Sequence, residues 1–255
     1  MKNNMKQIFL CEDTPEGIFT AVYDTWNSHL SREQFCIRVE DGHELELFAE
    51  YNRIQTSREK ALKVARTVKK QLGKKAYDMV FAVLLSHEED KADAIYYFLK
   101  LGFRTGPEVV SMHGQECVCR VFEIKRNVWN EAHFTKEFLR FCETEEKILL
   151  ARISPKNQVL PLVAEHFADR FPEENFVVLD EVHNMGLFHE KGKQWYLSGL
   201  HPEALNEIWA HRESSEYEKL WKTFFHTISI RERENYRCQR TNCAIRYREY
   251  MTEFG

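Results

Sequence analysis

The first 130 residues show apolar positions at helical spacing. After a short apolar segment at 7–10, the sequence Asp13-Thr14-Pro15 is typical of a helix start, with proline in the first turn. Ile18, Val22 and Trp26 then recur every four residues, which marks one face of a helix. Further stripes predict helices over 61–72, 77–85, 94–101 and 107–129, the first of them ending at Gly73. This half is therefore predicted to be mostly helical.

The pattern changes near residue 134, where short apolar runs separated by polar turns replace the helical stripes. Strands are expected at 138–141, 148–153, 176–179, 186–189 and 195–197. A helix over 159–171 interrupts them, and helical spacing returns from 208 to 230 and beyond. We predict an α+β fold with a helical N-terminal half, a small central antiparallel sheet with helices, and a helical C-terminal tail. The regions 1–130 and 131–255 form two domains or one continuous domain.

Composition and charge narrow the class of protein. The 255 residues are 43% hydrophobic and 30% charged, which is typical of a globular chain. The net charge of -4 means that any nucleic-acid surface must be a local patch. No apolar run could span a bilayer, and the start lacks the apolar core of a signal peptide. Seven scattered cysteines fit a reducing compartment, so a cytoplasmic location is expected.

Several large enzyme classes lack their signatures in this sequence. There is no Gly-x-x-x-x-Gly-Lys, Gly-x-Gly-x-x-Gly, Gly-x-Ser-x-Gly, His-Glu-x-x-His or Cys-x-x-x-Cys-x-x-Cys. Cys117 and Cys119 would point about 200° apart on a helix, so they could not easily share a metal. Cys238 and Cys243 are spaced more widely than is usual for structural zinc. No cofactor, no metal and no particular catalytic residue are predicted.

The C-terminal segment 221–250 is rich in arginine, with tyrosines between the charges. The guanidinium fork suits phosphate oxygens, and aromatic faces can stack on unpaired bases. In a helix, Arg233, Arg237 and Arg240 would share one side. Arg246 and Arg248 follow in the same segment. The segment is either a nucleic-acid contact or a solvated face that pairs with acidic neighbours.

Arg140 and Arg170 differ from these because they lie between apolar residues. Arg140 belongs to the sequence FLRF on an expected strand, and Arg170 belongs to HFADRF at an expected helix end. An arginine in such surroundings needs an anionic partner, because an unpaired buried charge is costly. That partner is either an internal carboxylate or a bound phosphate.

At these residues the sequence resembles a bacterial family known as probable DNA metabolism protein. The core of that family is a domain of unknown function that also occurs fused to uracil-DNA glycosylase-like enzymes. The similar positions in the second half are His133, FLRF, Glu143, Pro155, HFADRF, Trp195, Trp221, Phe225, Ile228, Arg233, Asn235, Gln239, Arg246 and Tyr247. Asp13 and the run at 16–22 carry a looser similarity in the first half. Ala244 departs from the family's usual proline. The resemblance implies a role beside DNA and a radical-SAM partner, reminiscent of photoproduct-lyase repair enzymes.

Three hypotheses follow. The preferred one is a DNA-binding accessory protein of DNA repair or modification, working with the radical-SAM partner. Its phosphate contacts would be Arg140, Arg170, Arg233, Arg237, Arg240, Arg246 and Arg248. The second is a nucleotide- or base-processing enzyme whose site lies in residues 131–198, with His133 and His166 as its polar participants. The third is a protein-interaction module that never touches DNA.

Overall fold

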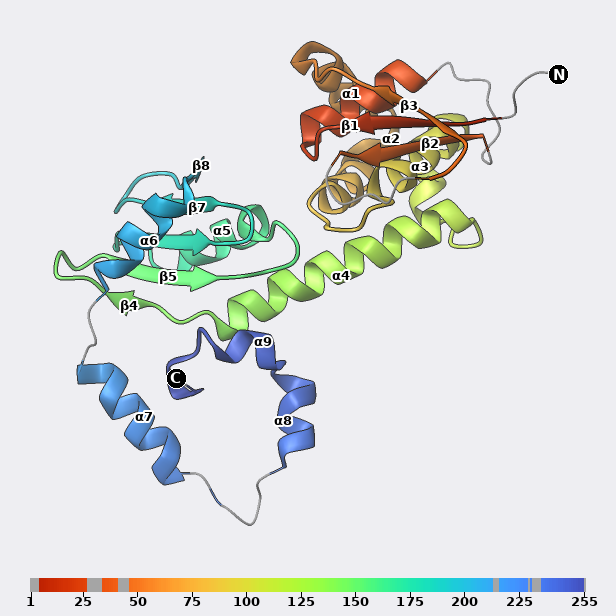
Figure 1. Cartoon of the computed structure of the whole chain (residues 1–255). Helices are drawn as coiled ribbons and strands as arrows, with labels where there is room; N and C mark the ends of the chain where they lie inside the picture. Colours follow the sequence, from red (N-terminus) through yellow and green to blue (C-terminus); the bar gives the residue numbers. More distant parts are fainter. Residues whose placement is uncertain are drawn as a thin grey trace. The chain divides into compact units, whose positions relative to one another are not determined.

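The computed structural model describes residues 5–26, 34–40, 46–212, 216–228, 230 and 235–254 (Figure 1). The chain divides into two compact units, Met1–Trp129 and Asn130–Gly255. Both units contain helices and a sheet, so the α+β class is confirmed. Within the described part of the chain, every helix is too short or too polar to cross a lipid bilayer.

The first unit is built on a three-stranded parallel sheet with the order β2-β1-β3. Its strands are β1 (Lys6–Cys11), β2 (Phe35–Val39) and β3 (Ala49–Arg53). Helix α1 (Pro15–Thr25) begins where the sequence predicts, and the Thr14 side chain accepts a hydrogen bond from the Gly17 amide at 2.9 Å. Strands β2 and β3 were not predicted, although the half is mostly helical as expected.

The longer helices of this unit differ in their limits from the prediction. The two stripes at 61–72 and 77–85 lie on one helix, α2 (Arg58–Leu84), which is kinked at Gly73, where φ is 83°. Helix α3 (Lys91–Thr105) agrees with the prediction. A short 3₁₀ helix, Pro107–Ser111, precedes α4 (Glu116–Phe138). Helix α4 therefore begins later and ends later than predicted, and FLRF is not a strand. Phe138 ends the helix, and residues 139–141 have no regular structure.

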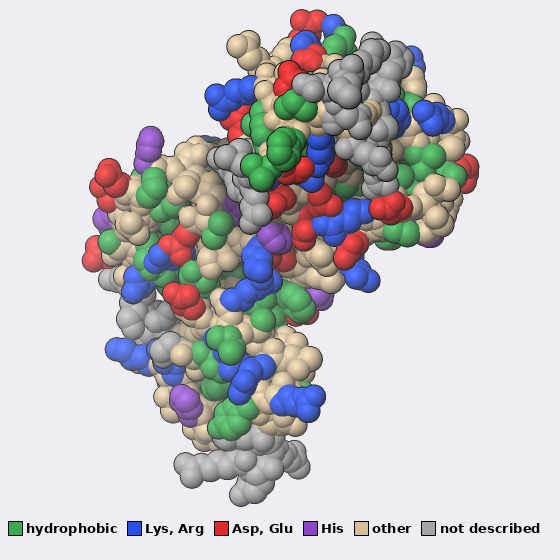
Figure 2. Space-filling view, turned by 45° about the vertical axis from the view of Figure 1, so that its right-hand side comes forward, with side chains coloured by type: hydrophobic (Ala, Val, Ile, Leu, Met, Phe, Trp, Pro, Cys, Tyr) green, Lys and Arg blue, Asp and Glu red, His purple; other side chains and the backbone are tan. Residues whose placement is uncertain are grey.

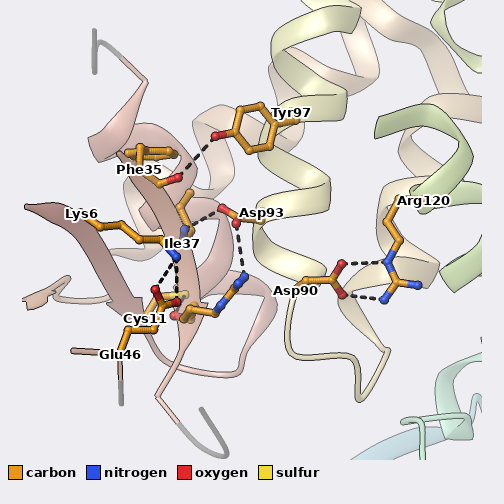
Figure 3. Close-up of polar contacts among 10 residues, drawn as sticks. Lys6, Cys11, Phe35, Ile37, Glu46, Asp90, Asp93, Tyr97 and Arg120 are labelled. Atoms are coloured by element: carbon orange, nitrogen blue, oxygen red, sulfur yellow. Dashed lines mark hydrogen bonds and ion pairs between the residues drawn. The ribbon is translucent and has the colours of Figure 1, made fainter. Parts of the chain in front are cut away.

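Edge strand β2 is joined to α3 through a largely buried carboxylate (Figure 3). Asp93 accepts hydrogen bonds from the Ile37 amide at 2.7 Å and from the Arg38 guanidinium at 3.2 Å. Burial raises the pKa of Asp93 to about 6. Close by, Asp90 receives two hydrogen bonds from Arg120 at 2.7 and 2.8 Å. The Asp93 contact satisfies a backbone amide that an edge strand leaves unpaired, whereas the Asp90–Arg120 pair links the start of α3 to α4.

The second unit contains a five-stranded sheet with the order β4-β5-β6-β7-β8. The strands are β4 (Cys142–Glu143), β5 (Leu149–Ile153), β6 (Phe176–Asp180), β7 (Met185–His189) and β8 (Tyr196–Gly199). Strands β5 and β6 are parallel, so the sheet is mixed rather than antiparallel as expected. The reason is helix α5 (Leu160–Arg170), which connects the two strands as a crossover. Apolar side chains of α5, including Val163 and Phe167, pack with those of the sheet.

The chain ends in a series of short helices, as the sequence predicts. They are α6 (Pro202–Ala210), α7 (Glu216–Ile228), α8 (Tyr236–Asn242), α9 (Ile245–Arg248) and a final 3₁₀ turn, Thr252–Phe254. Asn235 caps α8 by accepting a hydrogen bond from the Cys238 amide at 3.0 Å. The final turn contributes one buried carboxylate, Glu253, which bears on the site described next.

Candidate nucleic-acid interface

A groove lies between the C-terminal part of α4 and helix α5, within the second unit, and is called the α4–α5 groove below. Its cavity volume is about 720 Å³. The lining residues are His133, Lys136, Glu137, Leu139, Arg140, Phe141, His166, Phe167, Arg170 and Phe171. They are mostly basic or aromatic, and Glu137 is the one acidic residue among them.

Helical spacing explains how this groove forms. His133, Lys136 and Arg140 recur at three and four residues along α4 and just beyond its end, so they project to one side. His166 and Arg170 are likewise four residues apart on α5. The two motifs FLRF and HFADRF therefore meet, and four of the predicted site residues line one groove. Lys136 was not predicted, because the sequence was interpreted as leaving helix before this point.

Two cationic groups in the groove have no carboxylate partner among the described residues. Among the residues that the structure describes, neither the Lys136 ammonium nor the Arg170 guanidinium forms an ion pair. Arg170 is exposed, and its guanidinium carbon lies 5.6 Å from the centre of the Phe171 ring. These two groups are available to an external anion.

Arg140 also lines the groove but is already engaged. Its guanidinium forms an ion pair with Glu253 at 2.8 Å and donates to the Glu137 and Leu139 carbonyls at 3.0 and 3.3 Å. The Glu253 side chain is only 4% exposed. Burial disfavours its carboxylate, but the hydrogen bond and positive charge of Arg140, together with hydrogen bonds from the backbone and Trp221, outweigh that cost, so the pKa of Glu253 lies below its ordinary value. Of the two partners that the sequence allowed for Arg140, an internal carboxylate or a bound phosphate, the structure shows the carboxylate.

The two histidines of the groove have different surroundings. His133 lies 3.0 Å from the Glu137 carboxylate through Nε2. Burial and the positive charges of Lys136 and Arg170 lower the pKa of His166. At neutral pH, His166 is therefore an uncharged ring that can accept or donate a hydrogen bond.

The C-terminal arginines fall into two groups. Arg246 pairs with the buried carboxylate of Glu131 at 3.0 Å and lies over the Tyr247 ring at 4.8 Å. Arg248 lies 4.8 Å from the centre of the Phe254 ring. These contacts hold the C-terminal helices within their own unit. Arg246 therefore has an internal carboxylate partner, as Arg140 does.

Arg237 and Arg240 lie exposed on α8 and form no ion pair with any residue that the structure describes. Neither lines the α4–α5 groove. Arg233 lies outside the described residues, so the shared helical side predicted for these three stays a prediction. On the face drawn in Figure 2, basic side chains alternate with hydrophobic ones over the C-terminal part of the chain.

Other clusters of polar residues have structural explanations. Asp180 accepts hydrogen bonds from the amides of Val182 and His183 at 3.1 Å, and its other oxygen lies 2.7 Å from the His183 ring. This arrangement closes the turn after β6. All seven cysteines are free thiols. In the part of the chain that the structure covers, no three His, Cys, Asp or Glu side chains are arranged to hold a metal ion.

Residues 89–253 match the family model of a domain of unknown function, DUF4130. The chain belongs to the DUF4130 family. The matched region contains the whole α4–α5 groove and the C-terminal helices. The domain of unknown function in the resemblance is thus supported, while its link to DNA metabolism stays a prediction.

Other comparisons add little to the DUF4130 assignment. No curated protein matches the chain in sequence. A solved structure described as a member of the S1p family of ribosomal proteins with a DHH domain is 9% identical, and the match covers 73% of this chain and 74% of that one. Its TM-score of 0.30 is too low to support an argument about fold or function.

Proposed function

We propose that this DUF4130 protein is a nucleic-acid-binding accessory protein of DNA repair or modification, and that the α4–α5 groove contacts the phosphate backbone. The observation that carries the proposal is the pair Lys136 and Arg170, which line one groove without an internal carboxylate partner among the described residues. An exposed guanidinium beside an ammonium is well suited to phosphate oxygens. As the partner, we propose the radical-SAM enzyme that the family resemblance implies.

The structure refines which arginines belong to this proposal. Arg140 and Arg246 hold the buried carboxylates of Glu253 and Glu131, so we assign them to the stability of the unit. Arg170, Arg237 and Arg240 are exposed and unpaired within the described part of the chain, and they remain candidates for phosphate contact.

The test is a titration of a short fluorescent DNA oligonucleotide, followed by anisotropy at several salt concentrations. Removing Lys136 and Arg170 together should weaken binding and reduce the slope of log affinity against log salt by about 1.4 to 1.8, depending on whether the DNA is single- or double-stranded. The matched control is the double variant Arg66→Ala and Lys70→Ala, which removes two exposed charges from α2 in the first unit. Equal effects of the two double variants, or no binding at low salt, would contradict the proposal.

A second function is favoured by one observation. His166 is an uncharged base beside two cationic groups at neutral pH, and His133 lines the same groove. Such a pair could exchange protons with a bound nucleotide. If the protein is a nucleotide- or base-processing enzyme, His166→Ala should abolish turnover of modified DNA while leaving its binding intact. Co-purification with the radical-SAM partner, with and without nuclease, tests the third hypothesis. A pure protein-interaction role predicts that the partner is retained after nuclease treatment and that the protein binds no DNA.

A further inference from the structure

Aromatic rings accompany the cationic groups of the α4–α5 groove. Phe141 and Phe171 both line it and are both half-buried, with their ring centres 5.4 Å apart and their planes at 77°. Phe171 follows Arg170 directly, and the Arg170 guanidinium lies 5.6 Å from the centre of its ring. A group that binds phosphate therefore stands next to a partly exposed ring.

Burial distinguishes these rings from their neighbours in the core. Phe167 is 3% exposed and Phe176 is fully buried, and both belong to the core that joins α5 to the sheet. Phe141 contacts the two of them edge to face, so its inner side completes that core. Phe141 and Phe171 pack against this core on one side, and their exposed parts line the groove.

The dimensions of the groove limit what can reach these rings. A volume of about 720 Å³ lies in the range of sites for small organic ligands, and it can admit a nucleotide. In a duplex the bases are stacked inside and would have to be flipped out to touch a protein ring. Binding through phosphate contacts alone would not distinguish single strands from duplexes. Stacking on Phe141 and Phe171, by contrast, requires an unpaired base.

We propose that the α4–α5 groove selects single-stranded nucleic acid, with Lys136 and Arg170 holding phosphate while an unpaired base packs against Phe141 and Phe171. This inference rests on the proposed function and names its substrate class. His166 lies on the same side of α5 as Arg170, so its ring can form a hydrogen bond to the base or sugar.

The decisive experiment uses the unaltered full-length protein with three ligands. They are a short single-stranded oligonucleotide, the same sequence as a duplex, and an abasic strand that carries the same phosphates without bases. We expect the base-bearing strand to bind about tenfold more tightly than the abasic strand, and more tightly than the duplex. Equal affinity for all three ligands would overturn the inference. If that binding still depended on salt and on Lys136 and Arg170, the proposed function would survive. No binding at low salt would remove both.

A substitution locates the effect within the groove. Phe171→Leu keeps an apolar side chain but removes the ring, so affinity for the base-bearing strand should fall about fivefold, with little change for the abasic strand. Phe122→Leu, at a partly exposed ring in the first unit, is the matched control and should change neither. A parallel loss for both strands would count against stacking. Circular dichroism checks that each variant folds. If Phe171→Leu does not fold, the comparison of the three ligands with the unaltered protein decides the question.

Discussion

Glu131 anchors the C-terminal helix α9 to α4, and its replacement tests the distinction between structural and phosphate-binding arginines. The carboxylate is 3% exposed. It accepts hydrogen bonds from the Lys156 amide at 3.1 Å, from the Asn157 amide at 2.8 Å and from the Asn157 side chain at 2.6 Å. Arg246 forms the ion pair from α9 at 3.0 Å. The perturbations are Glu131→Ala and, separately, Arg246→Ala.

The two variants should lose different amounts of unfolding free energy, because Glu131 is buried and Arg246 is partly exposed. Asn157 is 4% exposed, so Glu131→Ala removes the acceptor of two buried hydrogen bonds, at about 1–3 kcal/mol each. The two lost hydrogen bonds therefore cost about 2–6 kcal/mol in total, and the partly exposed Arg246 guanidinium adds little to this. The Arg246 side chain is 42% exposed, so water screens the pair. Arg246→Ala also leaves Glu131 with three donors, and should cost about 1 kcal/mol.

Urea unfolding followed by circular dichroism measures both costs, and hydrogen exchange shows where protection is lost. We expect Glu131→Ala to reduce the unfolding free energy at least twice as much as Arg246→Ala, with faster exchange at residues 154–158 and 245–248. Arg246→Ala should bind a single-stranded oligonucleotide nearly as well as the unaltered protein. Equal costs of the two variants would refute the burial argument. A loss of binding in a stable Arg246→Ala protein would refute the structural assignment of Arg246.

Two further predictions concern carboxylates. The pKa of Asp93 is about 6 in the folded protein, above its ordinary value of 3.8, so the folded state holds this proton more tightly than the unfolded state. The unfolding free energy should therefore fall by about 2 kcal/mol from this group as the pH rises from 4 to 6, and Asp93→Asn should remove that part of the pH dependence. An unchanged slope in urea titrations across this range would contradict the prediction. In the second unit, Glu253→Gln should free the positive charge of Arg140 for the groove. Oligonucleotide affinity should then rise severalfold, and the slope against log salt should steepen by about 0.7; weaker binding by a folded variant would count against a cationic groove.

The sequence predicted those helices and strands that show a clear local pattern of apolar residues. The stripes of α1, α3 and α5 and the runs of β6 and β7 were found for that reason. Strand β3 is short, polar and only partly buried, and its pairing with β1 depends on residues more than forty positions away. The run FLRF was assigned to a strand because four apolar-rich residues fit either structure. The structure shows that α4 continues to Phe138, the first residue of FLRF, and that the rest of the run follows the helix.

Four of the predicted site residues line the α4–α5 groove, but the sequence does not show how they differ. Arg140 and Arg170 occupy similar sequence surroundings, each next to phenylalanine, and both line the same groove. Their difference lies in Glu253, a carboxylate 113 positions from Arg140, which reaches it through the final turn of the chain. No pattern around either arginine reveals such a partner. Lys136 was missed for the complementary reason, since its role depends on how far α4 extends.

Arg140 and Arg246 are each paired with a buried carboxylate, and this changes which residues support the nucleic-acid proposal. With a net charge of -4, the protein cannot attract a polyanion by its total charge, so the attraction must come from local groups whose charge is not cancelled. Arginines that neutralise buried carboxylates contribute little to that local field. Lys136 and Arg170 form no ion pair within the described part of the chain, and burial together with their positive charges lowers the pKa of His166. The proposal therefore depends on fewer residues than the sequence suggested, and two substitutions in the α4–α5 groove are enough to test it.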